Sequence, residues 1–205
     1  MTHCDCGIEV KNRAERRTLI TLLVINATLF VAEIISGIIA DSTALIADSL
    51  DMLADASVYA ISLYAVGKHL SLKAKAALTS GILQVMLGLG VLADILRRTL
   101  TGSEPEPQWM IIVGIMALIA NIGCVALIHK HRHGDVHMRA SWVFSANDVI
   151  ANLGVIGGGI LVVQLGSSWP DLVIGLAIAA IVIKGGIHII YDAKTSLATS
   201  SQPPT

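Results

Sequence analysis

The sequence has little charge and few aromatic residues. Only 14% of its 205 residues are Asp, Glu, Lys or Arg and 4% are aromatic, whereas 54% are hydrophobic. A soluble domain carries about 25% charged residues, so a water-exposed globular protein is excluded. The net charge of −1 offers no basic surface for nucleic acid, which is not expected as a partner.

Cysteine is also scarce, and no cleavable leader is recognisable. Three cysteines are present and one of them, Cys124, lies within an apolar run, so a disulfide framework is not expected. The first sixteen residues are polar and charged, with no short apolar core and small-residue cleavage site after them. We therefore expect the first spanning helix to act as its own insertion signal.

The hydrophobic residues gather in stretches of about 20 residues, the length that crosses roughly 30 Å of hydrocarbon as a helix. Strands are excluded because open sheet edges cannot lie in lipid. The sequence predicts an all-α integral membrane protein with six transmembrane helices, over 19–40, 43–66, 75–99, 109–129, 140–165 and 170–193. It divides the chain into an N-terminal tail (1–18), a transmembrane domain (19–194) and a short C-terminal tail (195–205).

The lysines and arginines predict the orientation of these helices. Eleven of them fall on one side of a six-helix arrangement, whereas only Arg97 and Arg98 lie near the opposite surface. Basic residues accumulate on the cytoplasmic side of membrane proteins. We expect both termini in the cytoplasm and a location in a bacterial-type inner membrane.

Three carboxylates interrupt the second apolar stretch. Asp51 and Asp55 are one helical turn apart, and Asp48 lies on the same stripe. An Asp at the middle of a bilayer costs about 2.5–3.5 kcal/mol and indicates a functional site by default. Like charges in a low dielectric repel unless a cation compensates. Cation binding is favoured over an ion pair with another helix, for which Lys184 is the only candidate at membrane depth.

The fifth stretch carries a matching polar segment, SANDVIAN, over residues 145–152. Asp148 and Asn152 share a helical face, whereas Asn147 is rotated by about 100°. This carboxylate and these amides could complete a four-ligand shell with Asp51 and Asp55. Each asparagine could equally form a hydrogen bond between helices.

Other residues could contribute further ligands. Glu33 lies at mid-membrane in the first stretch. Four histidines surround the fourth loop, where imidazoles could bind a divalent metal or merely keep the loop soluble: His129, His131, His133 and His137. A second soft-ligand segment, at the N-terminus, contains His3, Cys4 and Cys6.

Two segments resemble the cation diffusion facilitator family. Residues 42–55 (STALIADSLDMLAD) are similar to the motif on the second helix of that family, with Asp51 and Asp55 at its two ligand positions. Residues 30–37 (FVAEIISG) are similar to its first helix. The resemblance implies a usually dimeric six-helix exporter of zinc and related divalent ions, driven by proton exchange.

Two departures from the family pattern accompany this resemblance. The fifth helix of the family usually carries a His four residues before its Asp, and here Phe144 takes that position. Phenylalanine cannot ligate a metal, so Asn147 is the first choice for the fourth ligand and Asn152 the second. The resemblance also implies a short member, since the sequence ends about eleven residues after Lys194, without the usual cytoplasmic metal-binding domain.

The sequence therefore predicts a transporter and not an enzyme, with no catalytic residues and no tightly bound cofactor. Its substrates would be a divalent metal, Zn²⁺ first, and protons that release the metal from the same carboxylates. The alternative is a membrane metal sensor or assembly partner that binds metal through the histidine loop without transport. A homodimer is expected to form through the third and sixth helices.

Overall fold

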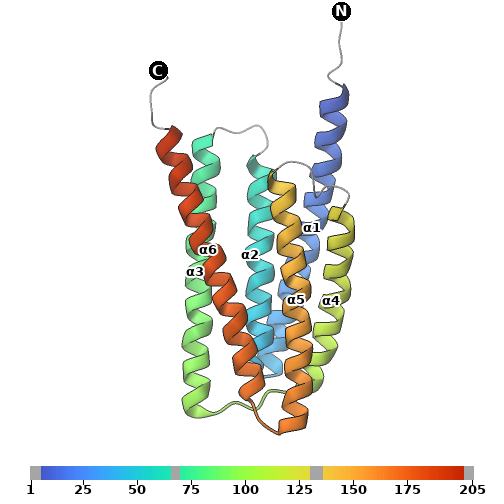
Figure 1. Ribbon diagram of the computed structural model, residues 1–205, viewed down its shortest axis with the longest axis vertical. Helices are drawn as coiled ribbons and strands as arrows, with labels where there is room; N and C mark the ends of the chain where they lie inside the picture. Colours follow the sequence, from blue (N-terminus) through green and yellow to red (C-terminus); the bar gives the residue numbers. More distant parts are fainter. Residues whose placement is uncertain (1–5, 66–69, 130–135, 201–205) are drawn as a thin grey trace, which may run out of the picture.

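The described part of the chain folds into six antiparallel helices, as predicted. The computed structural model describes residues 6–65, 70–129 and 136–200. The helices are α1 (Cys6–Ile39), α2 (Thr43–Ala65), α3 (Leu70–Thr101), α4 (Pro107–His129), α5 (Val136–Leu165) and α6 (Trp169–Ser200). Figure 1 shows that α1 begins and α6 ends at the same end of the bundle.

Several helices extend beyond the lengths that the sequence predicted. Helix α1 begins at Cys6, inside the expected tail, and α6 continues to Ser200. The prediction used the thickness of the hydrocarbon, but a helix does not have to end at the membrane boundary. Residues 9–17 contain Glu, Lys, Ala and Arg, which are good helix formers in water.

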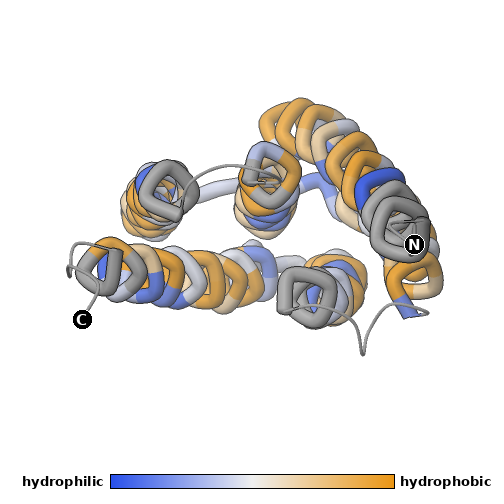
Figure 2. The backbone as a smooth tube through the Cα atoms, turned by 90° about the horizontal axis from the view of Figure 1, so that it is seen from above, coloured by the Kyte–Doolittle hydropathy of each residue, from blue (hydrophilic) through white to orange (hydrophobic). Residues whose placement is uncertain are grey.

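Five of the six described helices are long and apolar enough to cross a membrane, and α2 is the exception. Every 18-residue window of α2 contains Asp48, Asp51 and Asp55. Helix α2 packs against α1, α3, α5 and α6. Seen from above, it lies in a row between α1 and α3, with α6 and α5 in the facing row (Figure 2). Its polar groups are therefore covered by protein rather than by lipid, which makes this helix tolerable in a bilayer.

The sixth helix packs most extensively on α3, and glycines allow the two backbones to approach closely. A Cβ built on Gly186 would lie 2.9 Å from the backbone oxygen of Gly81, and a Cβ on Gly81 would lie 2.9 Å from that of Gly186. A Cβ built on Gly175 would likewise lie only 2.8 Å from Cγ2 of Thr43 on α2. These three glycines are therefore packing residues, whereas Gly157 faces open space.

The turn between α1 and α2 is held by a charged side chain of α3. Asp41 has a φ of 48°, a left-handed conformation that costs a non-glycine residue about 1–2 kcal/mol. The buried guanidinium of Arg98 donates to the carbonyl oxygen of Asp41 at 2.6 Å and pairs with the carboxylates of Asp41 and Asp94. Asp94 pairs with Arg97 as well as with Arg98, and the Arg98 pair fixes this turn.

A second clamp holds the start of α2. The carboxylate of Asp171, fully buried at the start of α6, accepts three hydrogen bonds. The donors are Ser42 Oγ at 2.6 Å, the Thr43 amide at 2.7 Å and the Ala44 amide at 3.0 Å. The first amides of a helix lack partners within the helix, so Asp171 caps α2 from another helix.

Candidate metal site

The three aspartates of α2 lie inside the bundle. Asp48 is fully buried, and the exposed fractions of Asp51 and Asp55 are 8% and 5%. They follow one another at three- and four-residue spacing, so the helix places them along one stripe. Neighbouring members are close enough for their charges to repel.

Helix α5 presents Asp148 to this stripe. Its side chain is 1% exposed and close enough to Asp55 and Asp51 for electrostatic repulsion. The two helices also meet at Tyr59 and Ser145, whose hydroxyl oxygens are 3.5 Å apart. The predicted juxtaposition of the α2 and α5 carboxylates is therefore present in the fold.

Helix α1 contributes a fifth buried carboxylate, Glu33. It is 0% exposed and lies within electrostatic range of Asp48 and Asp51. Both of its carboxylate oxygens, like both of Asp48, are buried without a hydrogen-bond partner among the described residues. Five carboxylates from three helices are thus gathered in one low-dielectric interior.

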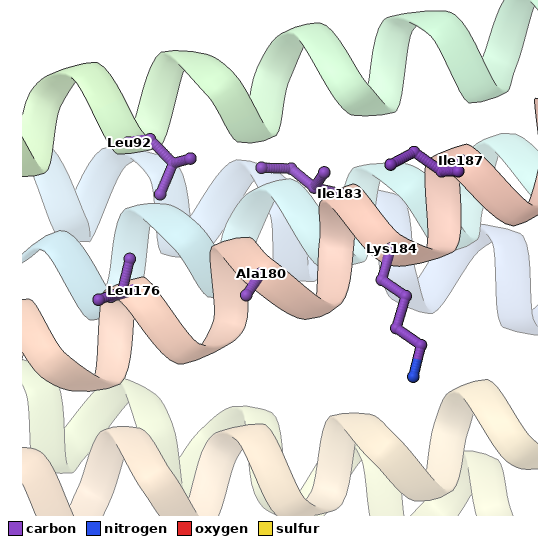
Figure 3. Close-up of a pocket in the computed structure, with 6 residues that line it drawn as sticks. All are labelled: Leu92, Leu176, Ala180, Ile183, Lys184 and Ile187. Carbon is purple, nitrogen blue, oxygen red and sulfur yellow. The ribbon is translucent and has the colours of Figure 1, made fainter.

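The part of the chain that the structure describes supplies no positive charge to this interior. No ion pair there joins any of the five carboxylates to a basic side chain. Lys184, the candidate partner, is exposed on α6. Figure 3 shows its side chain extending from α6 on the side away from Leu92 of α3. Arg98 is engaged by Asp41 and Asp94 in the α1–α2 turn.

Buried amides add further oxygen atoms. Asn152 donates its Nδ2 to the carbonyl oxygen of Asp148 at 2.7 Å, and Asn26 donates to that of Leu22 at 3.0 Å. Because their NH₂ groups are used within their own helices, the Oδ1 atoms remain buried without a described donor. An interior with many acceptors and few donors favours a cation with hard oxygen ligands.

Sequence reasoning missed two polar residues of this interior. Asn121 of α4 is fully buried, and its Nδ2 lies 3.9 Å from Sδ of Met52. It is the single amide in the apolar run 109–128, which was a usable signal. Tyr59 follows Asp55 by one helical turn and donates its hydroxyl to Asp55 Oδ2 at 3.3 Å.

Not every predicted ligand joins the cluster. Asn147, the first choice for the fourth ligand, is exposed, whereas Asn152 is 0% exposed. The rotation of α5 that buries Asp148 also buries Asn152, which follows one turn later. The same rotation turns Asn147, which directly precedes Asp148, toward the outside of the bundle. Asn152 is consequently the amide that the fold brings toward Asp148.

The histidine loop lies mostly outside the described residues. His129 ends α4 and is exposed. His131 and His133 lie outside the described ranges, as do His3 and Cys4, and the side chains of Cys6 and His137 are not described either.

The carboxylates lie in the same interior, but they do not converge on a single metal position. Within the described ranges, no three His, Cys, Asp or Glu side chains are close enough together to hold a metal ion. Binding of an ion would require the α2 and α5 side chains to converge.

Residues 19–198 match the family profile described as the cation efflux transmembrane domain. The chain is 24% identical over 195 residues to the metal cation efflux system protein CzcD of Cupriavidus metallidurans, covering 86% of this chain and 62% of that protein. It is 26% identical over 196 residues to the zinc transporter ZitB of Pectobacterium atrosepticum, covering 86% and 59%.

A third relative is the cadmium, cobalt and zinc/H⁺-K⁺ antiporter of Bacillus velezensis. It is 22% identical over 194 residues, covering 88% of this chain and 62% of that protein. The chain therefore spans about three fifths of the length of these relatives.

Proposed function

This chain belongs to the cation efflux transmembrane domain family, and from that premise we propose that it exports a divalent metal cation across the membrane in exchange for protons. The matched region, residues 19–198, contains all five carboxylates of the interior cluster. Multiple apolar helices make the chain an integral multi-pass membrane protein. Family and relatives indicate a transporter rather than an enzyme.

The observation that carries this proposal is a set of buried carboxylates without a counter-ion. Glu33, Asp48 and Asp148 each keep at least one oxygen unpartnered at 0–1% exposure in the described structure. An uncompensated buried carboxylate is strongly unfavourable. A transported cation would compensate this charge while it is bound and leave the charge available for the next ion.

The proposed ligands are Asp51 and Asp55 of α2 with Asp148 and Asn152 of α5. Asn152 replaces Asn147 in this set because it is buried and shares a face with Asp148. Zinc accepts carboxylate oxygens at about 2.0–2.2 Å in tetrahedral sites. An oxygen-only set is harder than one with imidazole, so manganese, cobalt and cadmium are tested beside zinc.

Proton exchange would use the same oxygens. A proton and a metal ion compete for a carboxylate, so protonation would release the metal and metal binding would displace protons. The relative from Bacillus velezensis carries H⁺ in its name. Metal would move outward if protons move inward in exchange, and the basic residues of this chain favour cytoplasmic termini. Arg16, Arg17, Lys75 and Lys194 all lie toward the end of the bundle where α1 begins.

We also propose that two copies associate through the membrane-facing sides of α3 and α6. These helices expose large apolar side chains, including Leu89 at 53% and Leu96 at 62%. Cross-linking and native mass spectrometry in mild detergent test the association. A monomer that transports metal at the full rate would exclude it.

Metal flux into proteoliposomes tests the transport proposal. We expect uptake of zinc that depends on a pH gradient and is lost in Asp51→Ala, with Glu104→Gln as the matched control. Glu104 is an exposed carboxylate in the connection between α3 and α4. Metal binding without flux would instead support the sensor, and wild-type flux by Asp51→Ala would exclude the assigned site.

A further inference from the structure

A groove runs along the membrane-facing side of the row formed by α1, α2 and α3. Helices α1 and α3 both pack on α2, which lies between them (Figure 2). The groove has a volume of about 570 Å³, within the range of sites that hold small organic ligands. It is separate from the carboxylate interior, which lies behind α2.

The groove is apolar along its length and charged at one end. Its apolar lining includes Ile34, Ile38, Ile46, Leu50, Met86 and Gly90. Its charged end consists of Asp41, Asp94, Arg97 and Arg98. The apolar walls are open to the surroundings, since Ile38 and Met86 are 66% and 64% exposed.

The dimensions of the groove match one leaflet of a bilayer. From Arg97 to Met86 the groove follows α3 over about 16 Å, at 1.5 Å per residue. One leaflet contributes about half of a 30 Å hydrocarbon core. The charged end lies near the membrane boundary, because the apolar span of α3 ends at Thr101 and the exposed Trp109 lies just beyond it.

The charges at this end are of both signs, and two of the side chains are partly exposed. Arg97 uses its Nε and Nη2 on Oδ1 of Asp94, and its side chain is 59% exposed. The Asp41 side chain is 48% exposed, while its Oδ1 pairs with Arg98 and its Oδ2 accepts the Glu104 amide at 3.2 Å. Two arginines and two aspartates give the rim no net charge. Such a rim complements a headgroup that carries one anion and one cation.

We propose that this groove is a binding site for a phospholipid with an amine headgroup, of the phosphatidylethanolamine class. One acyl chain lies between α1 and α3 on Ile46 and Leu50 of α2. The phosphate accepts hydrogen bonds from Arg97, and the ammonium faces Asp41. A transmembrane helix from a second copy fits less well, since it would need to continue past the charged end through both leaflets.

Two substitutions distinguish the contribution of the acyl chain to lipid binding from that of the headgroup. A Cβ added at Gly90 meets nothing within 4 Å, so Gly90→Leu fills the groove without disturbing the packing of the helices. Arg97→Gln removes the phosphate donor and leaves the Arg98–Asp94 pair in place. The matched control is Gly123→Leu on α4, where an added Cβ also meets nothing within 4 Å.

Native mass spectrometry of the delipidated full chain in detergent measures the binding. Phosphatidylethanolamine and phosphatidylglycerol with identical acyl chains are added separately, and circular dichroism checks the fold of each variant. We expect the wild type and Gly123→Leu to bind phosphatidylethanolamine more tightly than phosphatidylglycerol. We expect Gly90→Leu to weaken both lipids, and Arg97→Gln to weaken phosphatidylethanolamine by about tenfold, the effect of losing a charge-assisted hydrogen bond.

Three results would overturn the proposal. They are unchanged lipid binding by Gly90→Leu, equal or tighter binding of phosphatidylglycerol by the wild type, and a wild-type dimer that Gly90→Leu dissociates. The last result would assign the groove to a second copy of the chain.

Discussion

The same residue type behaves in opposite ways at two levels of this bundle. At the end where α2 begins, Asp171 is as deeply buried as any residue of the chain, yet three donors surround its carboxylate. In the interior, Asp48 is equally buried, and neither of its oxygens has a described partner. Burial alone therefore does not distinguish a structural aspartate from a functional one.

The difference lies in what the neighbouring helices supply. Asp171 meets free amides at the start of α2, and Asp94 meets two guanidinium groups. Asp48, by contrast, has other carboxylates, Asp51 and Glu33, within electrostatic range. A partnered carboxylate stabilises the fold, whereas a group of unpartnered ones favours binding of a cation.

The largest effect is expected in the interior. Asp148→Ala should reduce metal flux by more than about tenfold, because it removes the only α5 carboxylate from the cluster. It should leave the metal-free protein as stable as the wild type or more stable, since it also removes repulsion. Flux assays and thermal unfolding in detergent measure the two quantities. Wild-type flux by a correctly inserted variant would contradict the assigned role.

The opposite outcome is expected for Asp171→Ala. Loss of three hydrogen bonds to a buried carboxylate should lower the free energy of unfolding by about 2–4 kcal/mol. Metal affinity of the folded fraction should be preserved, because Asp171 lies outside the carboxylate cluster. Thermal unfolding and calorimetric metal titration test this pair of results. A variant with wild-type stability would show that the cap of α2 is dispensable.

Acidification should weaken metal binding, because protons and the cation compete for the same oxygens. Below the pH at which the cluster takes up a proton, affinity should fall about tenfold per pH unit for each proton displaced. Calorimetry in buffers of different ionisation enthalpy counts the released protons. Affinity independent of pH, with no protons released between about pH 6 and 8, well above the ordinary Asp range, would exclude these carboxylates from the exchange.

A smaller effect should separate the two asparagines of α5. Asn152→Leu should weaken metal affinity by roughly tenfold. This is the effect expected when one neutral ligand is lost, or when a residue that orients a ligand is lost. Asn147→Leu should leave affinity unchanged, because its side chain points out of the bundle. Equal losses in both variants would mean that α5 rotates when metal binds.

Much of this arrangement could be predicted from the sequence, and the reasons are geometric. Bilayer thickness fixed the number of helices, and the period of 3.6 residues placed Asp51 and Asp55 on one face. The same period related Asp148 to Asn152. Which face of α5 points inward was not predictable, since it depends on packing against other helices. The sequence therefore does not exclude Asn147 as a ligand, although its side chain is exposed in the fold.

The remaining contacts join residues that are distant in the chain. Asp171 caps a helix that begins 128 residues earlier, and no local pattern marks that partnership. Asn121 enters the interior from α4 through the pairing of α4 with α1 and α5. Motif spacing identifies residues within one helix, whereas the neighbours of that helix are set by tertiary packing.

The close glycine contact between α3 and α6 has a mechanical consequence. With Gly81 and Gly186 backbone to backbone, these two helices form a stiff pair. Arg98 of α3 forms an ion pair with the α1–α2 turn, and Asp171 of α6 accepts hydrogen bonds from the start of α2. Both sets of contacts lie at the same end of the bundle, so that end acts as a pivot. We expect the pair to swing furthest at the opposite end, where α1 begins and α6 ends.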